Sequence, residues 1–147
     1  MKFFYLFKKI IKSNLVFTFP SRKKILIYDN EENDLFFNFF KKEDCEIFFN
    51  RFEKINILIL FLSLFNFKGK LSTSYVYTYI KYAKPTLILT HIDNNTSFYK
   101  LKNYFKNIHI IAVQNGLRHE IFKIFQNIEK KDNLYIDYLF VMDEAHK

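Results

Sequence analysis

The stretch TLILTHIDNNTSFYKL, residues 86–101, shows most clearly how this chain folds. Its first seven residues, Thr86–Ile92, are almost continuously apolar, as a strand is when a parallel sheet is covered on both faces. A polar turn at 93–95 follows, and after it Phe98 and Leu101 fall on one helical stripe. The stretch therefore predicts a buried strand joined by a tight turn to a helix.

The same order of apolar run, turn and amphipathic segment recurs along the chain. The predicted strands are Lys23–Asp29, Cys45–Phe49, Thr86–Ile92, Asn107–Gln114 and Tyr135–Asp143. The predicted helices are 32–42, 56–68, 72–84, 97–105 and 117–130. Strands that alternate with helices over short connections imply βαβ units. The predicted fold class is therefore α/β, a Rossmann-like doubly wound parallel sheet of about five strands with helices on both faces.

The helices carry more detailed expectations. The first predicts one apolar stripe, made of Leu35, Phe36, Phe39 and Phe40. Asn56 is the expected cap of the second, although its unbroken apolar run also allows a strand. Ser72 or Ser74 is the expected cap of the third, which should stop before Pro85. The tyrosines expected on one face of that helix are Tyr75, Tyr79 and Tyr82.

The net charge of +8 is concentrated at the amino terminus. Residues 1–24 contain seven basic residues and no acidic ones, which leaves 16 basic against 15 acidic residues from Ile25 onward. Since the rest of the chain is nearly neutral, a nucleic-acid partner is not predicted. We expect residues 1–22 to form a basic, aromatic arm and residues 23–147 to form the Rossmann-like domain. The arm is either a short amphipathic helix, which would allow peripheral membrane contact through residues 1–24, or a solvated extension.

The chain shows features typical of a cytoplasmic protein. Cys45 is the single cysteine, so no intrachain disulfide can form, which suits a reducing compartment. The most apolar stretch, Ile55–Phe67, has 13 residues and falls short of the roughly 20 that a membrane-spanning helix needs. The expected location is therefore the cytoplasm, with the inner membrane face as a peripheral site.

Polar residues gather where the predicted strands end. Because the carboxyl ends of parallel strands meet at one edge, where open α/β sheets bind ligands, these residues predict a ligand site. The alternative is that each polar cluster only ends a strand and caps a helix. The candidate binding residues are Asp29, Asn94, Asn95, Gln114, Asn115, Gly116 and Arg118. His91 and Asp93 share a face of an extended segment, which suits a metal or a proton relay. The alternative for His91 is a structural hydrogen bond at the edge of the core. No third ligand has a recognisable spacing, so no metal is predicted.

The Asn115-Gly116 turn would open the next helix. Free N–H groups at the start of a helix favour an anion such as a phosphate, and Arg118 could bind the same anion. A surface arginine, or an ion pair between Arg118 and Glu120, is the alternative. The chain contains no glycine-rich nucleotide loop, no HExxH motif and no serine elbow.

Residues 79–118, YIKYAKPTLILTHIDNNTSFYKLKNYFKNIHIIAVQNGLR, resemble the bacterial surface carbohydrate biosynthesis proteins. The resemblance lies in a KP-strand-IDNN turn, an FY-containing helix and a strand that ends in QNG-R. It implies a two-domain glycosyltransferase-like architecture of the GT-B type and a role in lipopolysaccharide or capsule synthesis. It further implies that the IDNN and QNGLR residues face the cleft between the domains, with His91 or Asp93 as the base that deprotonates an acceptor hydroxyl.

The resemblance also implies a second, donor-binding domain. A nucleotide sugar would be the donor substrate, no separate cofactor is expected, and a sugar or sugar phosphate would be the acceptor. Since the chain ends just past its last predicted strand, we expect an acceptor-side domain that is inactive alone. The chain would then be a fragment, a split gene product whose carboxyl-terminal partner domain lies on another chain, or a degenerate remnant. The alternative is a non-catalytic Rossmann-like module that binds a phosphate-bearing ligand or a partner protein.

Overall fold

A computed structural model describes residues 12–29, 34–65, 70–93, 95–114 and 135–141 of the chain. Its main feature is a five-stranded sheet in which every neighbouring pair of strands is parallel, in the order β3-β2-β5-β6-β7. The strands are β2 (Ile25–Ile27), β3 (Cys45–Ile47), β5 (Leu87–Thr90), β6 (His109–Val113) and β7 (Tyr138–Phe140). Each lies within one of the predicted apolar runs. The α/β class and the parallel, Rossmann-like sheet are therefore confirmed.

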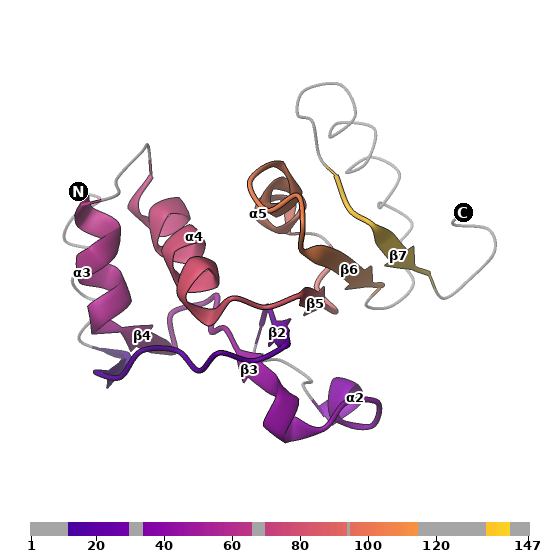
Figure 1. Ribbon diagram of the computed structural model, residues 1–147, viewed down its shortest axis with the longest axis horizontal. Helices are drawn as coiled ribbons and strands as arrows, with labels where there is room; N and C mark the ends of the chain where they lie inside the picture. The colour runs from indigo at the N-terminus through magenta and orange to yellow at the C-terminus, as the bar shows by residue number, and fades with distance from the viewer. Residues whose placement is uncertain (1–11, 30–33, 66–69, 94, 115–134, 142–147) are drawn as a thin grey trace.

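Helices lie on both faces of this sheet (Figure 1). The helical segments are α2 (Asp34–Phe37), η1 (Lys42–Asp44), α3 (Ile57–Phe65), α4 (Leu71–Ala83), α5 (Thr96–Tyr99) and η2 (Lys100–Asn103). Helices α4 and α5 cover one face and α2 the other. Strand β2 is buried along its whole length because it is covered on both sides, which explains its unbroken apolar run.

Two apolar clusters form the core. The larger lies on the α4 side, where Leu26, Ile88 and Ile110 from three strands meet Tyr79 of α4 and Phe98 of α5. The smaller lies on the α2 side. Its buried members are Ile25, Ile27, Phe36, Cys45 and Leu89. Successive residues of β2 and β5 alternate between the two clusters, as the period of a strand requires.

Helix α3 begins where the sequence predicts. The buried Asn56 accepts a hydrogen bond from the Ile59 N–H at its Oδ1 atom, 3.1 Å away, and caps the first turn. Its Nδ2 atom donates to the carbonyl oxygen of Thr18 at 2.6 Å. Asn56 therefore caps the start of α3 and connects the helix to the distant segment that contains Thr18. The helical interpretation of this apolar run is confirmed from Ile57 to Phe65.

The predicted cap of α4 is wrong. The helix begins at Leu71, and its N-cap residue is Lys70, which makes no side-chain capping bond. Ser74 is instead buried in the helix, and Ser72 lines a pocket described below. The other end agrees with the prediction, because the helix stops at Ala83 and Lys84 turns into the left-handed region, with φ of 50°, before Pro85.

Two predicted stripes are only partly buried. In α2 a single turn forms, so Phe36 alone is buried while Leu35 and Phe39 are exposed. On α4, Tyr75 and Tyr79 are buried, whereas Tyr82 is partly exposed and stacks on Phe19 with ring centroids 5.0 Å apart. A stripe predicts which side chains share a face, but the length of the covering surface decides how many of them are buried.

The helix predicted at 97–105 divides in two. A short α-helical segment, α5, passes directly into the 3-10 helix η2 at Lys100. Phe98 and Leu101 remain buried and Phe105 packs against the same cluster, so the apolar stripe is retained. The helix predicted at 117–130 lies outside the described residues.

A second, two-stranded parallel sheet was not predicted. Strand β1 (Asn14–Val16), within the predicted arm, pairs with β4 (Lys54–Asn56). Next to this ladder, Ser13 Oγ donates to the carbonyl oxygen of Phe52 at 2.5 Å. Three-residue strands are too short to leave a pattern in sequence, and the partners lie far apart along the chain. Part of the predicted arm is thus joined to the loop that follows β3.

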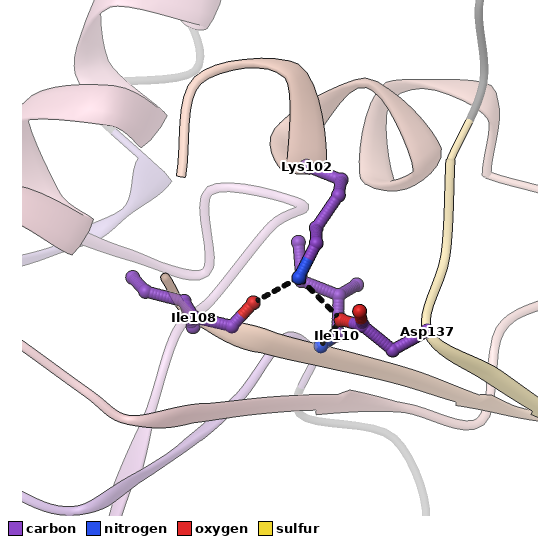
Figure 2. Close-up of polar contacts among 4 residues, drawn as sticks. All are labelled: Lys102, Ile108, Ile110 and Asp137. Carbon is purple, nitrogen blue, oxygen red and sulfur yellow. Dashed lines mark hydrogen bonds and ion pairs between the residues drawn. The ribbon is translucent and has the colours of Figure 1, made fainter. Parts of the chain in front are cut away.

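A network around Lys102 joins η2 to the last two strands (Figure 2). Lys102 Nζ donates to the carbonyl oxygen of Ile108 at 2.9 Å and to Asp137 Oδ2 at 2.7 Å. The same Oδ2 atom accepts the Ile110 N–H at 2.8 Å. Because Ile110 is in β6 and Asp137 directly precedes β7, this network holds the start of the edge strand in register.

Candidate functional site

The strand order places a ligand-binding position between β2 and β5. The chain passes from β2 to β3 on one side and later adds β5 on the other side of β2. In open α/β sheets, ligands bind outside the carboxyl ends of the strands at the point where the order reverses in this way. Asp29 follows β2 and His91 follows β5 at this position. Ile27 and Leu89 are register partners, so continuing both strands by two residues brings Asp29 level with His91.

His91 is buried, with 3% of its surface exposed, and the ring of Phe36 from α2 lies 6.1 Å from its own. Among the described residues, neither of its ring nitrogens has a hydrogen-bond partner. Burying a polar group without a partner costs free energy, so a histidine kept in this position is a candidate for function. The structure thus places the predicted residue at the reversal point, on the α2 face of the sheet.

Replacing His91 with leucine is expected to raise the free energy of unfolding by about 1 kcal/mol, because leucine fills the space without burying a polar atom. Urea denaturation followed by circular dichroism measures the change. The exposed His109 provides the matched control, and His109→Leu should alter stability by less than about 0.5 kcal/mol. A clear loss of stability in His91→Leu would contradict the interpretation that the imidazole is unsatisfied.

Asp93 and Gln114 are also buried at this edge of the sheet. The backbone carbonyl of Asp93 accepts a hydrogen bond from the Tyr99 hydroxyl at 2.6 Å, which fixes the turn before α5. Burial, with the nearby Asp93 carboxylate, raises the pKa of Tyr99 well above its ordinary value, so the phenol stays protonated and can donate. The Gln114 N–H donates to the carbonyl oxygen of Phe140 at 2.8 Å and extends the ladder between β6 and β7.

Sequence reasoning missed Arg51 and Asn50. Arg51 Nε lies 3.9 Å from Asp29 Oδ2, and the carboxylate is buried while the guanidinium is half-exposed. Both residues belong to the loop between β3 and β4, and their approach to the site depends on how that loop folds back. A lone arginine in a short polar segment carries no sequence signal for this position.

A pocket of about 230 Å³ opens at the same edge of the sheet, on the face covered by α4 and α5. Its lining comes from residues that follow β2 and β3, from α4, α5 and η2, and from Asn95, the N-cap of α5. The aromatic and aliphatic part comprises Tyr28, Phe48, Phe52, Val76, Tyr77 and Leu101. The polar part comprises Asn50, Ser72, Thr73, Asn95, Ser97 and Lys100. Of the predicted site residues, Asn95 lines this pocket.

The pocket walls are held in place by specific local structure. Asn95 caps α5, since its Oδ1 atom accepts the Ser97 N–H at 3.0 Å. Phe52 has a φ of 67°, a region that costs a bulky residue about 1–3 kcal/mol and persists where the surrounding structure imposes it. Burial raises the pKa of the Tyr28 phenol far above its usual range. Its hydroxyl group therefore stays neutral at physiological pH.

The remaining predicted residues cannot be placed. Asn94, Asn115, Gly116 and Arg118 lie outside the described residues, so the structure neither brings them to the edge nor separates them from it. Within the described part of the chain, no three His, Cys, Asp or Glu side chains form a group that could hold a metal ion. In that same part, no helix is both long enough and apolar enough to cross a membrane.

Comparisons with protein-family models, with curated proteins and with solved structures gave no match for this chain. The resemblance of residues 79–118 to surface carbohydrate biosynthesis proteins therefore stays a prediction. The fold and the geometry at the carboxyl edge of the sheet carry the functional argument.

Proposed function

We propose that this chain is the acceptor-side domain of a glycosyltransferase-like protein in cell-surface polysaccharide synthesis, and that its pocket binds a sugar or a sugar phosphate. The observation that carries the proposal is the lining of the pocket at the carboxyl edge of the sheet. Aromatic rings such as Tyr28 and Tyr77 form one part of the wall, and amide and hydroxyl groups such as those of Asn50 and Thr73 form another. Sugars present both apolar ring faces and hydroxyl groups, so this combination suits them.

The size of the pocket limits which ligands can bind in it. Its volume of about 230 Å³ lies below the range of about 300–1,000 Å³ that is usual for drug-sized ligands. A single sugar ring, with or without a phosphate, suits this space better than a whole nucleotide sugar. In the proposal, the donor nucleotide is therefore bound by a separate domain, and no cofactor is needed in this one.

The proposal assigns the proton transfer to the end of β5. A transferase must remove a proton from the acceptor hydroxyl as the new bond forms, and an imidazole or a carboxylate can accept it. His91 and Asp93 are the candidates, because both follow β5 at the edge where the pocket opens. Neither residue lines the pocket itself, and His91 lies on the α2 face of the sheet, opposite the face on which the pocket opens. In this proposal the acceptor hydroxyl must therefore reach past the pocket lining to the end of β5.

The test is a calorimetric titration of the full chain with glucose, N-acetylglucosamine, their 1-phosphates and uridine diphosphate. We expect saturable binding of at least one sugar or sugar phosphate. Asn50→Ala should weaken that binding about tenfold, because it removes an amide that can bond a ligand hydroxyl. Asn38→Ala, at an exposed position after α2, is the matched control and should bind as the unmodified chain does.

Three results would contradict the proposal. One is the absence of saturable binding for every sugar and sugar phosphate tested. Another is unchanged affinity in Asn50→Ala, provided that circular dichroism shows a folded variant. Saturable binding of uridine diphosphate alone would move the donor role to this domain and reject the acceptor-side assignment.

A further inference from the structure

A second pocket, of about 200 Å³, is lined by residues of both sheets. Strands β1, β3 and β4, helix α4 and the segment that follows β1 all contribute to its wall. The rings of Phe19, Phe49, Tyr75 and Tyr79 supply aromatic surface, and Glu46 of β3 supplies a carboxylate. The second pocket therefore combines aromatic surface with a negative charge.

The carboxylate of Glu46 is held in a fixed orientation. Tyr79, which is 7% exposed, donates its hydroxyl proton to Glu46 Oε1 at 2.7 Å. Burial, with the nearby Glu46 carboxylate, raises the pKa of Tyr79 well above its ordinary value. The phenol therefore stays protonated and remains a donor to Glu46, which is itself partly buried in β3.

The negative charge of Glu46 lacks a basic partner. Among the described residues, no lysine, arginine or histidine nitrogen lies within ion-pair distance of this carboxylate. Lys54 also lines the pocket, but its exposed ammonium lies over the ring of Phe49, 4.6 Å from the centroid. A partly buried carboxylate without a cation costs free energy, which a bound cation would offset. The contact of Lys54 with Phe49 shows that this aromatic wall accommodates an ammonium group.

Hydrogen bonds from Asn56 hold the wall of the second pocket together. The Asn56 N–H donates to the Tyr75 hydroxyl oxygen at 2.9 Å, and Asn56 Nδ2 donates to the carbonyl oxygen of Thr18 at 2.6 Å. These bonds connect β4 to α4 and to the segment after β1. On α4, the rings of Tyr75 and Tyr79 lie with their centroids 6.3 Å apart. Because the wall is already formed, a ligand would bind without paying to order it.

We propose that the second pocket binds a small organic ammonium ion, a primary amine on a short apolar stem, with its ammonium group at Glu46 and its stem against the aromatic rings. The carboxylate accepts N–H bonds, and the faces of the rings attract a cation. The volume of about 200 Å³ limits the stem to a short chain or a single ring. The inference goes beyond the sugar-binding proposal and does not rest on it, because among the described residues Phe48 alone lines both pockets.

The first test is a titration of the full ¹⁵N-labelled chain with n-butylammonium and with phenethylammonium, followed by NMR spectroscopy. We expect saturable shifts of the amide resonances of Glu46 and Asn56. The probes 1-butanol and butyrate offer a similar stem without the positive charge, so they should cause no saturable shift. Equal affinity for 1-butanol, or saturable binding of butyrate in place of the amines, would overturn the proposal. The absence of saturable binding for both ammonium ions would do so as well.

The second test removes the charge at Glu46. Glu46→Gln keeps the size of the side chain and an acceptor oxygen for Tyr79, so it should weaken the binding of n-butylammonium at least about tenfold through loss of the charge alone. Glu43→Gln, which changes an exposed carboxylate in η1 outside the pocket, is the matched control and should bind as the unmodified chain does. Unchanged affinity in a folded Glu46→Gln variant would overturn the proposal.

The third test leaves Glu46 in place. Lys54→Met replaces the exposed ammonium with a neutral side chain and removes a like charge from the pocket, so n-butylammonium should bind about twofold more tightly or better. Tenfold weaker binding would show that Lys54 holds a negative group of the ligand, and would reject the cation assignment. This variant and the comparison with 1-butanol keep the proposal falsifiable even if Glu46→Gln does not fold.

Discussion

Phe98→Ala is expected to lower the free energy of unfolding by about 3–5 kcal/mol, because it removes a fully buried ring from the centre of the larger core. Phe98 is 0% exposed, and its ring packs edge-on against Tyr28 with centroids 5.2 Å apart. It meets Tyr99 in the same way at 5.9 Å. The cavity left by alanine would lie under the strand end that leads to the site. Urea denaturation followed by circular dichroism measures the change.

Phe39 supplies the control for this prediction. It is 82% exposed, although its spacing from Phe36 predicts a shared buried stripe. Phe39→Ala should change stability by less than about 0.5 kcal/mol. If both alanine variants cost the same, burial would not be the cause of the effect. A cost below about 1 kcal/mol for Phe98→Ala would contradict the packing described for α5.

Asp137→Ala is expected to lower the free energy of unfolding by about 2–3 kcal/mol. The variant removes the acceptor of two hydrogen bonds, one from the Lys102 ammonium and one from the Ile110 N–H (Figure 2). Both donors then lose the acceptor that they share at the start of β7. The effect is large because hydrogen bonds to charged groups are stronger than those between neutral groups. Equilibrium unfolding in urea near pH 7 measures the effect.

The pH dependence of the same network gives a sharper test. Partial burial raises the pKa of Asp137, but the hydrogen bonds from Lys102 and from the Ile110 N–H outweigh it, so the pKa lies below its ordinary value. A carboxyl group with a lowered pKa in the folded state stabilises the protein above the pKa of the unfolded chain. That stability is lost as the pH falls through the folded pKa. Asp137→Asn keeps the shape without the charge.

Asp137→Asn should therefore converge in stability with the unmodified chain at low pH. Near pH 7 the unmodified chain should be more stable than Asp137→Asn, and the difference should shrink as the pH falls to about 3. A difference that stays constant over this range would show that the charge of Asp137 does not contribute. Asp34→Asn, at an exposed position in α2, controls for the loss of a carboxylate elsewhere.

The parallel sheet was predictable because its strands are short apolar runs, and strands such as β2 and β5 are followed by polar residues. Strands β2 and β5 lie inside the runs at Lys23–Asp29 and Thr86–Ile92, and each ladder ends near the first polar residues. The helix after β3 and β4 was also predictable at its start, since Asn56 provides a capping side chain and an apolar run follows. These features depend on neighbouring residues, which a sequence displays directly.

The cap of α4 and the burial of the α2 stripe were not predictable in this way. Ser72 and Ser74 have hydroxyl groups that suit a cap, yet the helix starts at Leu71 and both serines serve elsewhere. Phe39 has the spacing of a buried residue, yet no element of the described chain covers it. In both cases, contacts with distant segments override a local preference.

The sequence predicted only part of the candidate site. Polar residues after the strands, such as Asp29 and His91, could be assigned to one edge from sequence, because parallel strands bring their carboxyl ends together. The sequence did not predict that Arg51 approaches Asp29, or that Asn50 and Asn95 line one pocket. Each of these contacts joins residues from separate loops. The exposure of Phe61 and Phe65 on α3 likewise depends on which parts of the helix other elements cover. Neighbouring residues determine the local backbone geometry, so a sequence shows it directly. Contacts between loops that are far apart in the sequence carry an entropic cost of closure, and the packing of the whole domain decides which of them form.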